Sequence, residues 1–159
     1  MHSTSNDLPL ATRKKVIGML ADRLADAIDL RSQVKHAHWS VRGPGFIALH
    51  ELFDKVVDVV DEQADDIAER IAQLGGGGPE IRGTIRQAAK GSSLPEYPLK
   101  ATSPAEHVQA VSAALAAFGG SLRTAIEHAD KAGDKGTSDL FTQASRAIDK
   151  SLWLVEANG

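Results

Sequence analysis

The 159-residue chain contains no cysteine. Disulfides, zinc fingers and thiolate clusters are therefore excluded, and any metal ligands must be histidines and carboxylates. Aromatic residues make up only 4% of the chain, and the many alanines favour helices over sheets. No apolar run approaches the ~20 residues that a membrane-spanning helix needs. A helical protein that does not cross a membrane is therefore the class to consider first.

Neither sign of charge dominates the sequence. The net charge is −3, so nothing in the overall composition argues for a nucleic-acid partner. The first fifteen residues have no apolar core and do not resemble a secretory signal, so we expect a cytoplasmic protein. The length and the 42% share of apolar residues suit one domain. We expect that domain to span residues 9–159, after a flexible tail at residues 1–8.

Four long helices are predicted, and no segment is typical of a strand. Apolar residues recur every three to four positions along the first helix. Glycine-rich turns at residues 43–45 and 75–79 end the first two helices. The expected helices cover residues 10–41, 46–74, 104–132 and 137–157.

Capping signals mark the starts of the last two helices. Ser103 suits the N-cap of the third helix, with Pro104 and Glu106 at its first and third positions. Thr137 is the expected N-cap of the fourth helix. The pair Gly119-Gly120 falls inside the third helix, where it either kinks that helix or allows another helix to approach closely.

The connection between the second and third helices is too long for a simple bundle loop. It extends from Pro79 to Pro98, and its centre, residues 84–90, is expected to form a short helix. The chain thus predicts an all-α fold, an antiparallel four-helix bundle with a short extra helix in one long connection. A single crossover between helices two and three fits a ferritin-like topology.

Four residues of the second predicted helix have side chains that bind metals, and they lie on one face. His50 and Asp54 are four residues apart, as are Asp65 and Glu69, so each pair shares a helix face. The offset from Asp54 to Asp65 is close to three turns, which keeps all four within an arc of about 100°. His50 and Glu69 are nevertheless roughly 28 Å apart along the helix axis. One helix therefore cannot bring all four residues to one metal ion.

Two copies of the chain resolve this difficulty. The pairs His50–Glu69 and Asp54–Asp65 share one midpoint, between residues 59 and 60. If two copies of the helix cross antiparallel at that midpoint, His50 and Asp54 of one copy face Glu69 and Asp65 of the other. A twofold axis then creates two identical sites. The valines around the midpoint suit a buried contact; they are Val56, Val57, Val59 and Val60. The spacing thus predicts a dimer whose interface is part of the active site.

A fifth ligand is expected near the end of the first helix. His38 is the candidate and His36 its competitor, because the two differ by about 200° around a helix and cannot face the same site. Histidine and carboxylate ligands suit iron, manganese or zinc. In an iron oxidation centre, carboxylates stabilise the ferric product while imidazole binds ferrous iron.

A solvated acidic helix is the competing interpretation of this pattern. An isolated pair of such residues on a helix is most often a surface pair. The second helix is rich in other acids, which produce metal-like stripes by chance; they are Asp58, Asp61, Glu62 and Asp66. Spacing alone therefore leaves the metal site and the solvated surface both open.

The segment from Lys35 to Gly76 resembles the signature of the Dps family, the mini-ferritins that protect DNA in starved bacteria. The resemblance extends over most of the chain, including TSDLFTQASRAIDKSLWLVEA near the C-terminus. It implies that one subunit gives His38, His50 and Asp54 to the iron site, and that its twofold partner gives Asp65 and Glu69. The implied protein is a hollow dodecamer that oxidises ferrous iron, preferably with hydrogen peroxide, and stores the ferric mineral.

The resemblance also suggests roles for residues around the site. Trp39 matches a tryptophan beside the iron centre of relatives, where it would quench a stray radical; a core tryptophan that fills a gap between helices is the alternative. Acids around threefold channels guide iron inward in the family. Asp139 is the best match for such an acid, with Asp130 and Asp134 as further candidates, and a solvated acid near a helix N-terminus is the alternative.

The sequence departs from the family in its DNA-binding features. Members that compact DNA often carry a long lysine-rich tail, whereas residues 1–15 offer only Arg13, Lys14 and Lys15 as basic residues. Phosphate binding depends on how many cations engage, so we expect weak or absent DNA binding. Three interpretations remain: an iron-oxidising storage cage, a DNA-compacting nucleoid protein with a secondary metal site, and a different metal-binding bundle in which zinc occupies the same groups.

Overall fold

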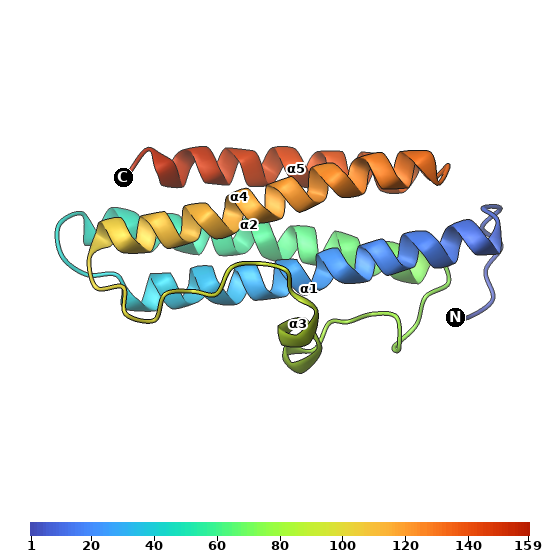
Figure 1. Ribbon diagram of the computed structural model, residues 1–159, viewed down its shortest axis with the longest axis horizontal. Helices are drawn as coiled ribbons and strands as arrows, with labels where there is room; N and C mark the ends of the chain where they lie inside the picture. Colours follow the sequence, from blue (N-terminus) through green and yellow to red (C-terminus); the bar gives the residue numbers. More distant parts are fainter.

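The computed structural model describes residues 1–159, and all of its regular structure is helical. This confirms the predicted all-α fold with an extra helix in the long connection (Figure 1). None of the helices is long and apolar enough to span a membrane. The helices are α1 Leu10–Ser40, α2 Phe46–Gln73, α3 Ile85–Gly91, α4 Pro104–Lys131 and α5 Lys135–Glu156.

The four long helices form an antiparallel bundle in which α2 and α4 lie on a diagonal. Helix α1 packs against α2 and α4, while α5 packs against α4 and α2. Because α2 and α4 run in the same direction, the connection between them must return along the whole bundle (Figure 1). Helix α3 lies in that connection and packs on the outer side of α1. The long connection is thus a consequence of the topology, as in ferritin-like bundles.

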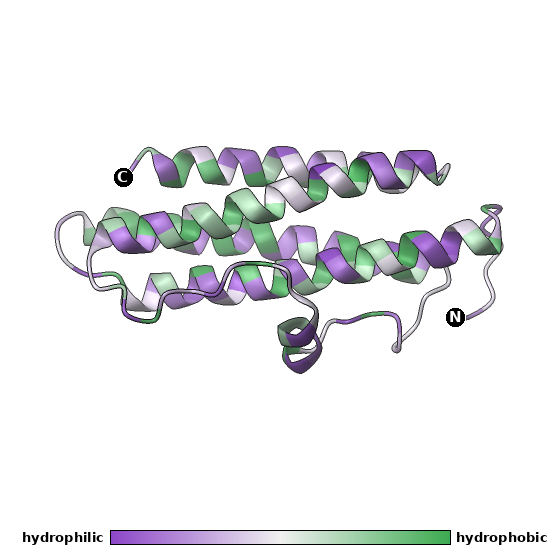
Figure 2. Ribbon diagram, viewed as in Figure 1, coloured by the Kyte–Doolittle hydropathy of each residue, from purple (hydrophilic) through white to green (hydrophobic).

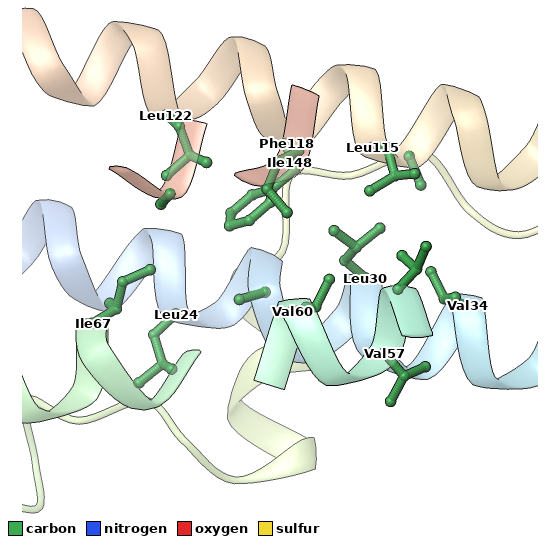
Figure 3. Packing of buried hydrophobic residues seen from close by; sticks show 14 of the residues in the cluster. Leu24, Leu30, Val34, Val57, Val60, Ile67, Leu115, Phe118, Leu122 and Ile148 are labelled. Atoms are coloured by element: carbon green, nitrogen blue, oxygen red, sulfur yellow. The ribbon is translucent and has the colours of Figure 1, made fainter. Parts of the chain in front are cut away.

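Apolar side chains from all four long helices meet in one core. Hydrophobic and hydrophilic positions alternate along each helix (Figure 2), and Figure 3 shows Leu24, Val60, Phe118 and Ile148 in the shared interior. Each of these side chains is almost completely buried. Removal of this apolar surface from water is the main stabilising contribution to the fold.

One expectation about the second helix is wrong. Val56, Val57 and Val60 were expected at a contact between two copies, yet all three are buried within the chain's own bundle. The helix is amphipathic, and these valines lie on the side that faces its own core. Of the four valines around the proposed crossing point, only Val59 is partly exposed. A dimer contact at this midpoint therefore has to use the polar side of α2.

The predicted cap of the third long helix is confirmed. Ser103 accepts a hydrogen bond from the Glu106 backbone N–H, and the Glu106 carboxylate accepts one from the Ser103 N–H at 2.9 Å. The same carboxylate accepts a hydrogen bond from the Thr102 N–H at 2.9 Å. These backbone donors lower the pKa of Glu106 to about 2, from an ordinary value of 4.5. The capping box thus depends on an ionised Glu106.

Glu106→Gln is expected to flatten the acid limb of the unfolding curve. Because the folded state lowers the pKa of Glu106, its stabilisation is present above pH 4.5 and is lost as the pH falls toward about 2. The variant should therefore unfold at a lower temperature than the parent at neutral pH, and the difference should vanish near pH 2. Thermal unfolding followed by circular dichroism across this range measures the effect. Glu156→Gln, an exposed acid at the end of α5, is the matched control.

The fourth long helix begins three residues earlier than a cap at Thr137 predicts, because its cap is Asp134. Gly133 ends α4 with a φ of 85°, so the chain turns directly into the next helix. The Asp134 carboxylate accepts hydrogen bonds from the Thr137 N–H at 3.0 Å and from Arg70 Nη2 at 2.9 Å. Since Asp134 is 2% exposed, this ion pair ties α2 to the start of α5.

Gly119 allows close approach between α4 and α5. A Cβ atom at this position would lie 3.2 Å from Asp149 Oδ1 of α5. Helix α4 continues unbroken through the Gly119-Gly120 pair. Of the two expectations for this pair, close helix contact is therefore the one that the structure confirms.

A buried aspartate that the sequence analysis did not identify anchors the long connection. Asp26 of α1 is completely buried, and its carboxylate is 2.7 Å from Arg23 Nη2. It also accepts a hydrogen bond from the Ser93 backbone N–H at 2.7 Å. A buried carboxylate needs such partners, because an unpaired charge in the interior is costly. Asp26 thereby holds the connection after α3 against the bundle.

The first residues of the chain lie against the end of α2. The His2 N–H donates to the Gly75 carbonyl oxygen at 2.7 Å, and the terminal ammonium is 3.3 Å from Glu80 Oε1. The flexibility expected for residues 1–8 remains a prediction.

Candidate metal centre

Two histidines meet where α1 ends and α2 begins. The rings of His38 and His50 stack with a centroid separation of 3.7 Å and an interplanar angle of 23°. The turn at residues 41–45 brings the two helices together here, and Gly45 has the left-handed φ of 74° that begins α2. His38 is buried, whereas His50 is partly exposed.

Each histidine donates its Nδ1 proton to the backbone of the other. His38 Nδ1 is 2.8 Å from the His50 carbonyl oxygen, and His50 Nδ1 is 3.0 Å from the His38 carbonyl oxygen. A carbonyl oxygen only accepts hydrogen bonds, so in the neutral rings Nδ1 carries the proton and Nε2 keeps a lone pair. Metal-binding histidines commonly have one ring nitrogen fixed in this way. The reciprocal pair therefore holds two nitrogen donors ready for a cation.

Asp54 brings a carboxylate to the same place. It lies one turn after His50 on α2, and its Oδ1 is 4.0 Å from His38 Nδ1. The side chain is half-exposed and forms an ion pair with Lys35 of α1. The hydrogen bond from the Lys35 ammonium lowers the pKa of Asp54. Three of the five predicted ligands, all from one chain, thus lie together at this end of the bundle.

The competing histidine points elsewhere. The His36 ring makes an edge contact with Tyr97 at a centroid separation of 4.9 Å, and its Nε2 is 3.4 Å from Ser40 Oγ. This places His36 toward the long connection rather than toward His50. The structure therefore brings His38, and not His36, beside the second helix.

The other two predicted ligands lie apart from this group. Asp65 and Glu69 are exposed on α2, and neither carboxylate takes part in a hydrogen bond or an ion pair. Asp65 is fifteen residues after His50, which is about 22 Å along a helix. Within the single chain, no group of three or more histidine or acidic side chains is placed so that it could hold a metal ion, and this includes His38, His50 and Asp54. The placement of these two acids in a site remains a prediction that requires a second copy.

Trp39 is not a core residue. Its side chain is 71% exposed in the single chain, so the expected alternative of a tryptophan that fills a gap between helices is wrong. It follows His38 directly and therefore borders the same end of α1. A tryptophan this exposed offers apolar surface to a partner.

The three acids considered for an entry channel differ in their surroundings. Asp139 is exposed and accepts a hydrogen bond from Gln143 Nε2 at 3.2 Å, while the exposed Asp130 pairs with Lys135. Asp134 is buried as the cap of α5 and is bonded to Arg70, which gives it a structural role. Asp139 and Asp130 have the solvent access that a channel residue needs.

A helical bundle with one long crossover and a histidine–carboxylate cluster is the class of ferritin-like proteins, and that family's domain matches residues 17–158. A DNA protection during starvation protein of Agrobacterium fabrum is 41% identical over 99% of this chain and 95% of its own length. The chain belongs to the Dps family of mini-ferritins. A solved structure of Mycobacterium smegmatis Dps in a tetragonal form superposes with a TM-score of 0.90 at 29% identity, over 99% of this chain and 93% of that one.

Another relative has a different name. The fine tangled pili major subunit of Haemophilus ducreyi is 32% identical over 95% of this chain and 78% of its own length. The pilus role in this name is that of the Haemophilus ducreyi protein. The broad function that this chain shares with its family is iron storage and DNA protection.

Proposed function

We propose that this protein is a ferroxidase that oxidises Fe(II), preferably with hydrogen peroxide, and stores the ferric product inside a hollow dodecamer in the bacterial cytoplasm. The observation that carries the proposal is the reciprocal hydrogen bonding of His38 and His50, which leaves both Nε2 atoms free as donors. Asp54 adds an oxygen donor beside them. Nitrogen and carboxylate donors together suit iron in both oxidation states.

The partner subunit completes the site in this proposal. Asp65 and Glu69 are exposed and free of partners in their own chain, so they are available to a second copy. A twofold contact along the polar side of α2 would carry them to the histidines of the neighbour. Each dimer then holds two sites, with three ligands from one chain and two from the other.

In the proposed reaction, one molecule of peroxide accepts two electrons. Each of two ferrous ions gives one electron, and peroxide with two protons becomes two molecules of water. A second, weaker iron position that shares a carboxylate would supply the second electron. This pairing avoids the hydroxyl radical that a single-electron reduction of peroxide releases. Trp39, next to His38, would quench radicals that escape.

Anaerobic loading with ferrous iron, followed by peroxide or by air in separate runs, tests the proposal. Ferric absorbance and peroxide consumption are recorded together. Fast oxidation by peroxide, with two ferrous ions lost for each peroxide consumed, is the expected result. If oxidation were no faster than in buffer, a zinc-binding or DNA-associated bundle would replace this proposal.

DNA binding is expected to be weak under the same proposal. Arg13 is held in the fold, where its guanidinium donates to the carbonyl oxygens of Leu8 and Leu74 at 3.0 and 3.1 Å. Lys14 and Lys15 are then the exposed basic residues of the N-terminal region. Few phosphate contacts give weak binding at physiological salt. Gel retardation of plasmid DNA over a range of salt concentrations distinguishes this protein from a DNA-compacting one.

Lys35→Met is expected to tighten metal binding. The Lys35 ammonium pairs with Asp54, so an incoming dication has to compete with a positive charge for the same carboxylate. Removal of that charge should lower the dissociation constant for Co(II), a redox-stable substitute for Fe(II), by roughly tenfold. Calorimetric titration measures the constant, and Lys55→Met, which removes an exposed lysine of α2, is the matched control. Weaker binding in the Lys35 variant would instead mean that Lys35 holds Asp54 in position.

A further inference from the structure

Outside the metal centre, the chain's only tyrosine is hydrogen-bonded to a buried histidine. Tyr97 lies in the long connection, and its Oη is 2.5 Å from His107 Nδ1 in the first turns of α4. The Tyr97 side chain is partly buried, whereas His107 is 1% exposed. Neither residue has a part in the proposed ferroxidase site. The short contact brings a phenol and a base together in a sheltered place.

Both groups are neutral at physiological pH. Burial raises the pKa of Tyr97 to about 12, and burial together with the charge of His36 lowers the pKa of His107. The phenol has no other acceptor, so its O–H donates to Nδ1 of the neutral imidazole. His107 Nε2 then carries a proton and is buried without a partner. An imidazolium at this position is costly, which makes proton uptake by His107 transient.

We propose that Tyr97 and His107 form a redox-active pair that takes up single oxidising equivalents and returns them to ferrous iron. A hydroxyl radical removes one electron from the phenol and becomes hydroxide, while the phenolic proton moves from Oη to His107 Nδ1. The products are a neutral tyrosyl radical and an imidazolium. A ferrous ion then gives one electron to the radical and becomes ferric, and the proton returns from Nδ1 to Oη.

The position of Tyr97 favours this role. Its ring is in edge contact with His36, which lies two residues before His38 on α1. Tyr97 therefore lies at the same end of the bundle as the proposed metal centre, although His36 faces away from His50. The source of the oxidant, a radical that escapes the paired reaction, rests on the proposed function, whereas the pair itself does not. The chain has no cysteine and only one tyrosine. Tyr97 is thus the single phenol that can serve as the acceptor of oxidising equivalents.

The first test uses the metal-free protein, so that it does not depend on iron chemistry. A laser flash generates the one-electron oxidant tris(bipyridine)ruthenium(III), and transient absorbance follows the tyrosyl and tryptophanyl radicals. A tyrosyl radical should form at least about tenfold faster than from N-acetyl-tyrosinamide, because a positioned base takes the proton. The rate should fall in D2O. A tyrosine that only anchored the loop would be oxidised no faster than the free compound, and that result would overturn the proposal.

Variants assign the radical and the base. Tyr97→Phe keeps the ring and should leave only tryptophanyl radicals, whereas Trp153→Phe, on the exposed end of α5, should leave the tyrosyl radical in place. His107→Gln retains an acceptor for the phenol but removes the base, so tyrosyl formation should slow by at least about tenfold. His107→Asn serves the same purpose if the first variant fails to assemble. An unchanged rate in an assembled His107 variant would remove His107 from the proposal.

The second test adds ferrous iron and peroxide. Freeze-quenched samples should show a tyrosyl signal by electron paramagnetic resonance in the parent and none in Tyr97→Phe, with equal rates of ferrous oxidation and more nicking of added plasmid DNA in the variant. If iron were not oxidised but the flash experiment succeeded, the proposed function would fail and the redox pair would stand. If iron were oxidised rapidly and the parent gave no tyrosyl signal in either test, the pair would be wrong and the ferroxidase proposal would stand.

Discussion

Glu69→Ala should slow ferrous oxidation by at least roughly tenfold, because loss of even an outer partner of a metal ligand typically costs 10–100-fold. Glu69 is exposed and has no hydrogen bond or ion pair within its own chain. Alanine is also the best helix former, so the substitution should not weaken α2. A loss of activity in this variant would therefore report on chemistry rather than on folding. Stopped-flow ferric absorbance gives the rate, and size-exclusion chromatography verifies the assembly.

Asp66→Ala is the matched control for this experiment. Asp66 is an exposed acid of the same helix, but it lies about 60° around the helix from Glu69 and off the predicted ligand stripe. Its removal subtracts the same charge without removing a ligand. If both variants lost activity equally, the acids of α2 would act only by attracting cations. If Glu69→Ala oxidised iron normally in an intact assembly, Glu69 would not be a ligand.

Local signals account for the elements that were predicted well. The glycine-rich turns at residues 43–45 and 75–79 interrupt helical periodicity within a few residues, and α1 and α2 end within one residue of the predicted limits. The Ser103–Glu106 capping box is contained in four residues and forms as expected. The start of α5 was predicted wrongly at Thr137, because Asp134 is an equally good cap and lies three residues earlier. Arg70, distant in sequence, pairs with Asp134 and joins the chosen cap to α2.

Contacts between distant segments explain what the sequence analysis missed. Asp26 and Ser93 meet across the long connection, and no periodicity marks either residue as a partner of the other. The same holds for Tyr97 and His107, which are joined only when the connection folds back on α4. Val57 shows that a helix-face pattern can also include a residue that does not belong to the site. It lies seven residues after His50 on nearly the same helix face, yet it is buried, so the pattern alone did not show where the core ends.

His38 illustrates how the structure sharpens a sequence hypothesis without replacing it. The helical angle between His36 and His38 showed that only one of them belongs with His50, and the resemblance favoured His38. The stacked rings and the reciprocal hydrogen bonds now show how His38 and His50 lie together. Asp65 and Glu69 are different, because the contacts that would place them belong to a second subunit. Their assignment rests on spacing and family resemblance, and it calls for an experiment that tests the sharing of ligands directly.

Two inactive variants should restore activity to each other when they share an assembly. His50→Ala removes a ligand of the first group, and Glu69→Ala removes one of the partner group. In a mixed dimer, one site lacks both residues, while the other joins the intact His50 of one chain to the intact Glu69 of the other. Random pairing of equal amounts makes about half of the dimers mixed, so about a quarter of the wild-type sites should be recovered.

The recovered rate of ferrous oxidation in refolded or co-expressed mixtures measures this effect against each variant alone. If all ligands came from one chain, no chain in the mixture would carry a complete set, and the mixture would remain as inactive as its parents. Mixing the assembled variants without subunit exchange is the control and should give no recovery. The isosteric pair Asp54→Asn and Asp65→Asn repeats the test without loss of side-chain volume. Recovery near a quarter with both pairs would establish that each site draws its ligands from two subunits, since no property of a single chain produces it.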